Sequence, residues 1–212
     1  MNKASDKVVY IVDDDEGVRE SLSALLQSVG VATRGFDSAE ASLEAIETDR
    51  PACMLVDVRM PGMSGLELQR QLVERKLPVR VVMITGHGDI AMAVQAMKNG
   101  ATDFLEKPFN DQTLIDLVHK CVELSMVDIQ QSTHRKRAQQ LLSLLTSREH
   151  EVLRELVAGK PSKKIASLLG VSTKTVDVHR SNIMRKTGAG STAEMIRIYL
   201  DAETAKPGSK PD

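Results

Sequence analysis

The sequence of 212 residues predicts two domains, an α/β domain with a doubly wound parallel sheet and a smaller all-α helix-turn-helix domain. Short apolar runs alternate with helical patterns over residues 5–125, which is typical of a parallel sheet covered by helices. Nearer the C-terminus, a short helix, a turn around Gly170 and a longer helix follow one another, as in a helix-turn-helix unit. Charge divides in the same way: residues 1–133 carry 13 Lys and Arg against 21 Asp and Glu, whereas residues 134–200 carry 13 against 5.

The first domain, expected over residues 5–125, is built from strands rich in Val, Ile and Leu. These strands are expected over 7–12, 31–36, 52–56, 79–84 and 102–105. Between them, apolar residues repeat at helical spacing. Helices are therefore expected over 17–29, 38–47, 64–76 and 89–99, with a further helix that begins at Asp111.

Polar residues stand at the carboxyl ends of four of these strands. Parallel strands bring those ends to one edge of the sheet, where ligands bind in open α/β folds. We therefore expect five side chains to converge there: Asp13, Asp14, Asp57, Thr85 and Lys107. Such a site suits an anion together with Mg²⁺, which takes one or two carboxylates, several waters and a phosphate oxygen. The plainer alternative for Asp57, which precedes a Pro-Gly turn signal, is a cap on the next helix.

The segment between the domains contains neither glycine nor proline from Asp111 to Leu145. Leucines keep partial helical spacing there, although residues 130–137 are polar and basic. We therefore expect a long helical linker over 126–143, with a flexible polar linker as the alternative. The second domain is expected over 144–204. The tail, 205–212, is rich in Lys, Pro, Gly and Ser and is expected to be disordered.

The longer helix of the second domain, expected over 173–186, carries a basic outward face. A net charge of +8 over residues 134–200 suits nucleic acid, because Lys and Arg replace condensed counterions. Arg can bind guanine, Asp can accept from cytosine and Val can touch a thymine methyl, whereas Lys and Thr nearer the ends are expected to hold phosphates. The candidate residues are Lys174, Thr175, Asp177, Val178, Arg180, Ser181, Arg185 and Lys186. The alternative is a basic helix that faces only solvent.

The composition narrows the class of protein further. Hydrophobic residues make up 42% of the chain, enough for packed cores. No apolar run approaches the roughly 20 residues that span a bilayer, and the first residues lack the apolar core of a secretory signal. Cys53 and Cys121 have apolar neighbours, so we expect buried free thiols in a reducing compartment. The expectation is a cytoplasmic protein without a membrane partner.

Several motifs resemble those of two bacterial domain families. The receiver domain of two-component response regulators is similar over residues 5–125, in the motifs at 12–16, 57–65, 84–89 and 100–109. The LuxR-type DNA-binding domain is similar in the motifs at 145–149, 165–166 and 171–186. Together the two resemble a response regulator of the FixJ class. For the first domain this implies a flavodoxin-like parallel five-stranded sheet of order 2-1-3-4-5.

The receiver resemblance also implies a role for each residue of the pocket. Asp57 would accept a phosphoryl group from a sensor histidine kinase. Asp14 and Asp57 would bind Mg²⁺, with Asp13 contributing through water and Arg59 through its backbone carbonyl.

Three further residues have implied roles. Lys107 would hold one phosphoryl oxygen, and its bond to Pro108 is cis in this family. Thr85 would hold another oxygen and, with Phe104, would act as the switch that reports phosphorylation. The alternative for Phe104 is an ordinary core residue.

The whole resemblance implies a DNA-binding transcriptional regulator that forms a homodimer on phosphorylation. Its partners would be the histidine kinase, double-stranded promoter DNA and RNA polymerase, and it would catalyse only its own phosphoryl transfer and dephosphorylation. One alternative is a Mg²⁺-dependent aspartyl phosphatase, although Arg59 stands where such an enzyme needs a second Asp. Another is a receiver with an RNA-binding or protein-docking output.

Overall fold

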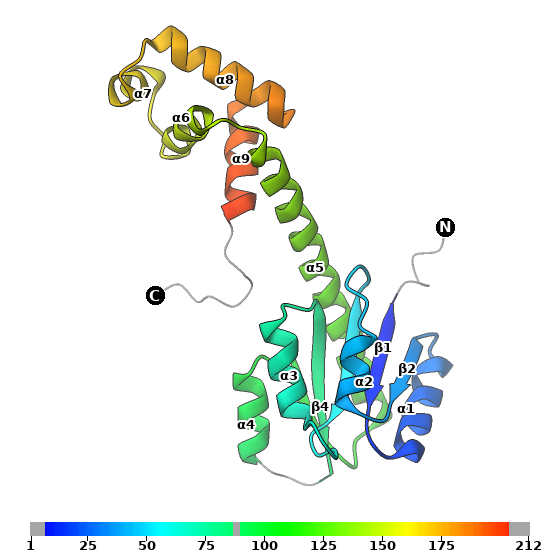
Figure 1. The fold of residues 1–212 in the computed structure, drawn as a ribbon. Coiled ribbons are helices and arrows are strands. Elements are labelled where there is room, and N and C mark those ends of the chain that lie inside the picture. Colours follow the sequence, from blue (N-terminus) through cyan, green and yellow to red (C-terminus); the bar gives the residue numbers. More distant parts are fainter. Residues whose placement is uncertain (1–6, 87–89, 204–212) are drawn as a thin grey trace. The chain divides into compact units, whose positions relative to one another are not determined.

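The computed structural model describes residues 7–86 and 90–203 (Figure 1). The chain divides into two compact units, Met1–Ile129 and Gln130–Asp212. Two expectations lie outside the described residues: the disordered tail, 205–212, and the helix start at Asp89.

The first unit contains a parallel sheet of order β2-β1-β3-β4-β5, which confirms the doubly wound fold and the order that the resemblance implied (Figure 1). Its strands are β1 (Val8–Val12), β2 (Ala32–Phe36), β3 (Ala52–Asp57), β4 (Val79–Thr85) and β5 (Asp103–Glu106). All of β1 is buried, and so is β3 as far as Val56. Helices cover both faces of these central strands and exclude water from them, which explains the continuous apolar sequences of the strands.

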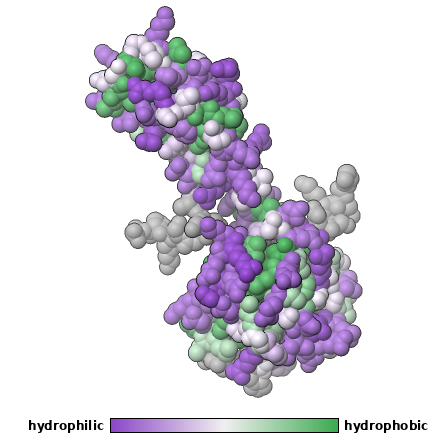
Figure 2. Space-filling view, viewed as in Figure 1, coloured by the Kyte–Doolittle hydropathy of each residue, from purple (hydrophilic) through white to green (hydrophobic). Residues whose placement is uncertain are grey.

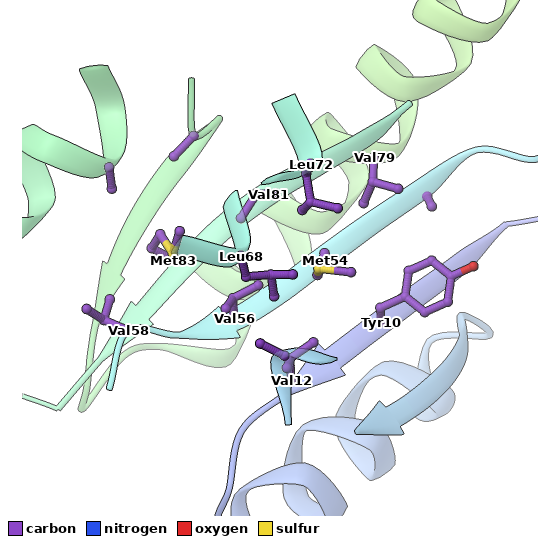
Figure 3. Close-up of a cluster of buried hydrophobic side chains, with 14 of the residues drawn as sticks. Tyr10, Val12, Met54, Val56, Val58, Leu68, Leu72, Val79, Val81 and Met83 are labelled. Carbon is purple, nitrogen blue, oxygen red and sulfur yellow. The ribbon is translucent and has the colours of Figure 1, made fainter. Parts of the chain in front are cut away.

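Two layers of helices cover the sheet. One layer consists of α2 (Ala39–Glu44), α3 (Gly65–Glu74) and α4 (Ile90–Lys98). The other consists of α1 (Glu16–Ser28) and the first part of α5 (Asp111–Ser143). Figure 3 shows the first core, in which Leu68 and Leu72 of α3 lie over Met54 and Val56 of β3. The first core contains methionines and the buried ring of Tyr10, whereas the second consists of aliphatic side chains and two cysteines.

The helix α2 is shorter than the expected 38–47, because it ends at Glu44. The next amide, Ala45 N–H, bonds to the Ser42 carbonyl and tightens the final turn. Beyond it, the buried Tyr10 hydroxyl accepts from the Glu47 N–H at 3.1 Å. The backbone that follows α2 is thus bonded to a residue of β1, a contact that the local pattern of residues 38–47 does not indicate.

The helix α5 is continuous over 33 residues, Asp111–Ser143, which confirms the helical linker. Its first part packs Leu114 and Val118 into the first unit, and its last part packs Ala138 and Leu142 into the core of the second. The intervening residues 130–137 are mostly exposed, and Figure 2 shows hydrophilic residues over much of this stretch. No glycine or proline interrupts the backbone hydrogen bonds, so the helix persists although its middle has no buried face.

Side chains of α5 also fix it to the beginning of two strands. The Ser125 hydroxyl accepts from Ala52 N–H at 3.0 Å and donates to the Pro78 carbonyl at 2.7 Å. Arg80 of β4 makes a two-pronged pair with Asp128, at 2.7 and 2.8 Å. These contacts set the direction in which α5 leaves the sheet of the first unit.

The second unit is helical, as expected. After the end of α5 it contains α6 (Ser147–Val157), α7 (Ser162–Leu169), α8 (Thr173–Thr187) and α9 (Thr192–Glu203). The turn between α7 and α8 passes through Gly170 with φ 65°, a left-handed conformation that favours glycine and ends α7. This geometry confirms the helix-turn-helix. Among the residues described, no helix is long and apolar enough to cross a membrane.

The start of α6 is fixed by a reciprocal cap. Thr146 Oγ1 accepts from Glu149 N–H, and the Glu149 carboxylate accepts from Thr146 N–H at 2.7 Å. The next residue, Ser147, is also of a type that commonly caps helices. The structure decides for Thr146, because Glu149 lies three residues after it and can return the hydrogen bond.

Candidate functional site

The register of the sheet places the polar strand ends together. Val12 of β1 pairs with Val56 of β3, so Asp13 and Asp57 are the next residues on neighbouring strands. Thr85 pairs with Glu106, so Lys107 follows directly at the end of β5. The carboxyl edge of the sheet therefore gathers residues that are up to 94 positions apart in the chain.

Lys107 is the centre of this pocket. Its Nζ lies 2.9 Å from Asp13 Oδ2 and 3.3 Å from Asp57 Oδ1. The other Asp57 oxygen, Oδ2, accepts from the Arg59 N–H at 2.7 Å. The Asp57 side chain is 13% exposed, so a reagent can reach it from one side only. The arrangement presents a carboxylate with one oxygen on an ammonium and one on a backbone amide.

Backbone contacts hold Lys107 and Asp57 in these positions. Lys107 N–H donates to the Thr85 carbonyl at 2.7 Å, and the peptide bond from Lys107 to Pro108 is cis, as the resemblance implied. Next to Asp57, the start of α3 approaches so closely that a Cβ on Gly65 would lie 2.3 Å from the Asp57 carbonyl oxygen. Only glycine fits at this contact.

The charges of the pocket do not balance. Burial raises the pKa of Asp57, and the negative charge of Asp13 raises this pKa further. The hydrogen bond from Arg59 N–H and the charge of Lys107 lower the pKa, but they do not outweigh burial. Burial lowers the pKa of Lys107, but the hydrogen bond and charge of Asp13, together with the charge of Asp57, raise it overall. One ammonium is thus shared by two carboxylates, and the pocket keeps an excess of negative charge that favours a bound cation.

The acidic loop before α1 is held by a residue that sequence reasoning missed. Arg19 Nη1 donates to the backbone carbonyls of Asp13 at 2.8 Å and Asp14 at 3.0 Å. Asp13 is buried, Asp14 is exposed, and Asp15 caps α1 by accepting from Val18 N–H. A basic residue one turn into the helix after an acidic run was the available signal.

The oxygen donors of this edge fit Mg²⁺. Within the described ranges, no group of three or more His, Cys, Asp or Glu side chains is arranged to hold a metal. Mg²⁺ requires fewer, because it usually keeps several waters and binds one or two carboxylates. Asp13 and Asp57 lie beside the same ammonium, and Asp14, which follows Asp13, is exposed, so this edge offers carboxylate oxygens to such an ion.

The two expected switch residues lie on adjacent strands. Thr85 ends β4 and is 4% exposed. Phe104 of β5 is half-buried, pairs with Met83 of β4, and packs against the core that includes α3 and α4. The side chain of Phe104 therefore faces the layer of α2, α3 and α4.

The helix α8 divides the expected DNA-binding residues into two groups. Five are exposed: Lys174, Asp177, Val178, Ser181 and Arg185. The other three are bound within their own unit. Thr175 contacts the capping residue Ser172, Lys186 pairs with the buried Glu149 at 2.7 Å, and Arg180 donates to side chains of two other helices.

Comparison with known proteins matches both units. Residues 9–119 match the response regulator receiver domain, and residues 143–199 match the luxR family of bacterial regulatory proteins. The chain therefore belongs to the two-component response regulators, and it combines a receiver domain with a LuxR-type helix-turn-helix domain.

Similarity to whole proteins narrows the class. The transcriptional regulatory protein FixJ of Azorhizobium caulinodans is 45% identical over 198 residues, which cover 93% of each chain. The structure of the response regulator StyR is 42% identical with a TM-score of 0.78, covering 92% of this chain and 98% of that one. Full-length FixJ from B. japonicum is 35% identical with a TM-score of 0.55, over 94% and 98%. The protein is a FixJ-class transcriptional regulator, as the relatives named transcriptional regulatory protein FixJ indicate.

Proposed function

We propose that this protein is a transcriptional regulator controlled by phosphorylation of Asp57, with a sensor histidine kinase as phosphodonor and Mg²⁺ as cofactor. Receiver domains generally bind Mg²⁺. The observation that carries the proposal is the shared ammonium, which lies 2.9 Å from Asp13 and 3.3 Å from Asp57. In this proposal the receiver spans 5–125, the linker 126–143 and the DNA-binding domain 144–204.

The residues of the pocket account for the chemistry. A carboxylate oxygen of Asp57 attacks the phosphorus of a phosphohistidine, the new O–P bond forms, and the N–P bond breaks with its electrons left on the imidazole. Lys107 and the Thr85 hydroxyl hold phosphoryl oxygens, so charge is stabilised where it develops. Asp13, Asp14, Asp57 and the Arg59 backbone carbonyl would hold the metal ion, which offsets the repulsion between carboxylate and phosphoryl group.

Phosphorylation then shifts a balance between two packings of the first unit. Thr85 and Phe104 would report the phosphoryl group to α4, β5 and the start of α5, where Val94 and Met97 of α4 are about half exposed. A change of a few kcal/mol is enough to move such an equilibrium. The favoured packing forms a homodimer, presents two α8 helices to promoter DNA, and allows contact with RNA polymerase. A regulator that meets a kinase and DNA in this way works in the cytoplasm.

A labelling experiment tests the proposal. The full chain, incubated with Mg²⁺ and a labelled small-molecule phosphodonor, should take up one phosphoryl group and bind duplex DNA more tightly. Asp57→Asn should do neither, whereas Asp49→Asn, which changes an exposed loop carboxylate, should behave like the parent. Equal labelling of Asp57→Asn and the parent would refute phosphorylation at this position, and binding to RNA but not to duplex DNA would refute the proposed output.

A further inference from the structure

One side chain of the recognition helix α8 is turned toward its own unit rather than toward a DNA groove. Arg180 Nη1 donates to Ser162 Oγ at 3.0 Å, and Nη2 donates to Thr192 Oγ1 at 2.8 Å. Ser162 is the first residue of α7 and Thr192 is the first residue of α9. The guanidinium of Arg180 therefore joins the starts of two helices to the middle of a third.

A neighbouring carboxylate completes this network. Asp177 Oδ1 accepts from Ser162 Oγ at 3.2 Å and lies 3.8 Å from Arg180 Nη1. The Arg180 side chain is only 32% exposed, whereas that of Asp177 is 57% exposed. Both terminal nitrogens of Arg180 thus have oxygen partners in the free protein.

Helix geometry separates Arg180 from four of the five exposed candidates, all except Asp177. Lys174, Val178, Ser181 and Arg185 follow one another at intervals of four, three and four residues, so they form one stripe along α8. All four are exposed. Arg180 lies roughly 130° around the helix axis from the middle of that stripe. A helix that lays this stripe in the major groove directs Arg180 to its flank.

Arg185 provides the contrast within the same helix. It lies on the exposed stripe, and its Nη2 reaches Asn182 Oδ1 at 3.4 Å, at the long end of hydrogen-bond distances. Its guanidinium can rotate to meet a guanine edge without giving up a strong contact. For Arg180 the same movement would leave the Ser162 and Thr192 hydroxyls without their donor.

We propose that Arg180 is a positioning residue, which sets the angle of α8 against α7 and α9 through Ser162 and Thr192, while bases are read by the exposed stripe. This inference rests on the proposed DNA-binding function. Loss of Arg180 then weakens binding to every DNA sequence by the same factor, because all contacts of α8 shift together. Loss of a base reader weakens only the sequences that carry its base.

Four variants of the full chain test the proposal, each with Mg²⁺ and a small-molecule phosphodonor. The preferred duplex is first selected with the parent from randomised DNA, and affinities are then measured for that duplex and all its single-base variants. Arg180→Gln should lower all affinities by a common factor of about tenfold, with an unchanged order of preference, because α8 is no longer held at its binding angle. Arg185→Gln is the matched control and should flatten the preference at one base pair.

The double variant Ser162→Ala/Thr192→Val separates positioning from direct contact. It leaves the arginine in place but removes both acceptors, so it should lose affinity to the same extent as Arg180→Gln. The salt dependence of binding should remain that of the parent in both, whereas loss of a phosphate contact would reduce its slope by about one ion. Arg180→Lys, which can keep one of the two bonds, should recover part of the affinity.

Each other result overturns a defined part of the argument. A changed preference at one base pair, a reduced salt slope in Arg180→Gln, or a double variant that binds like the parent would refute positioning while leaving DNA binding intact. Failure of the parent to select any duplex would instead refute the proposed function together with this inference. Circular dichroism at the assay temperature shows whether a variant has unfolded. If either Arg180→Gln or the double variant is unfolded, the other one tests whether Arg180 positions α8.

Discussion

Replacement of Gly65 by alanine tests how closely the start of α3 is built against the phosphoacceptor. An added Cβ would lie 2.3 Å from the Asp57 carbonyl oxygen and 2.8 Å from Val56 Cγ1. The first of these neighbours is backbone and cannot rotate away. Asp57 and α3 must therefore separate until the contact exceeds about 3.0 Å, which is the shortest distance that real Cβ atoms show.

The expected cost follows from this clash. Forcing extra volume into a filled site destabilises a protein by about 1–3 kcal/mol, and alanine returns at most about 1 kcal/mol through its better helix propensity. We expect a net loss of about 1–2 kcal/mol in the stability of the first unit. The displaced Asp57 backbone should also slow phosphorylation, because misplacement by about 1 Å can reduce a rate about 100-fold.

Hydrogen exchange in the intact chain measures the effect unit by unit. Peptides from β1, β3 and α3 report the opening free energy of the first unit, and peptides from α6 and α8 provide an internal reference. Gly35→Ala is the matched control, because a Cβ there meets only the Arg19 side chain at 3.7 Å. The reasoning is refuted if Gly65→Ala leaves both the hydrogen exchange of the first unit and the rate of phosphorylation at parental values. The contact between position 65 and the Asp57 carbonyl would then affect neither stability nor the reaction.

Two further predictions concern a carboxyl group and a helix cap. Burial raises the pKa of Asp57 in the folded state above its pKa in the unfolded chain. The folded protein therefore has its full stability below the unfolded-state pKa and loses part of it as the pH rises through the folded-state pKa. Asp57→Asn mimics the neutral form of this carboxyl group. In urea unfolding, this variant should be more stable than the parent at pH 7 but not below about pH 4. An equal or lower stability of the variant at pH 7 would contradict this prediction. Thr146→Val removes the hydroxyl that caps α6 and donates to the Glu149 carboxylate, while the bond from Thr146 N–H remains, and it should cost the second unit about 1–2 kcal/mol. The control is Ser143→Ala, which removes an exposed hydroxyl and should change stability by less than about 0.5 kcal/mol. If Thr146→Val destabilised only the first unit, the assignment of Thr146 as the cap of α6 would be contradicted.

Sequence reasoning succeeded where local rules apply. The alternation of apolar runs and helical patterns identified the parallel sheet, and a parallel sheet necessarily gathers its carboxyl ends, so Asp57 and Lys107 could be placed on one edge. The absence of glycine and proline from Asp111 to Leu145 identified one continuous helix. The helix-turn-helix was visible because its turn needs a left-handed residue, which Gly170 provides.

The remaining features depend on contacts between distant parts of the chain. The Glu47 N–H, which follows α2, bonds to the hydroxyl of Tyr10, 37 residues away, and the exclusion of any side chain at position 65 is set by the approach of α3 to Asp57. The inward direction of Arg180 and Lys186 is set by Ser162, Thr192 and Glu149 on other helices. A residue type and its helical phase indicate what a side chain can bind, but not which partner lies within reach.

The sequence by itself determined the elements, their order and the edge of the sheet that carries the chemistry, because hydrophobic period, turn residues and strand direction are local properties. Only the tertiary structure decided that Lys107 is shared by Asp13 and Asp57, and that Arg180 faces its own unit. Those outcomes depend on distances of about 3 Å between segments 94, 50 and 18 residues apart. Such distances are fixed by the packing of whole helices and strands, so no pattern within one segment contains them.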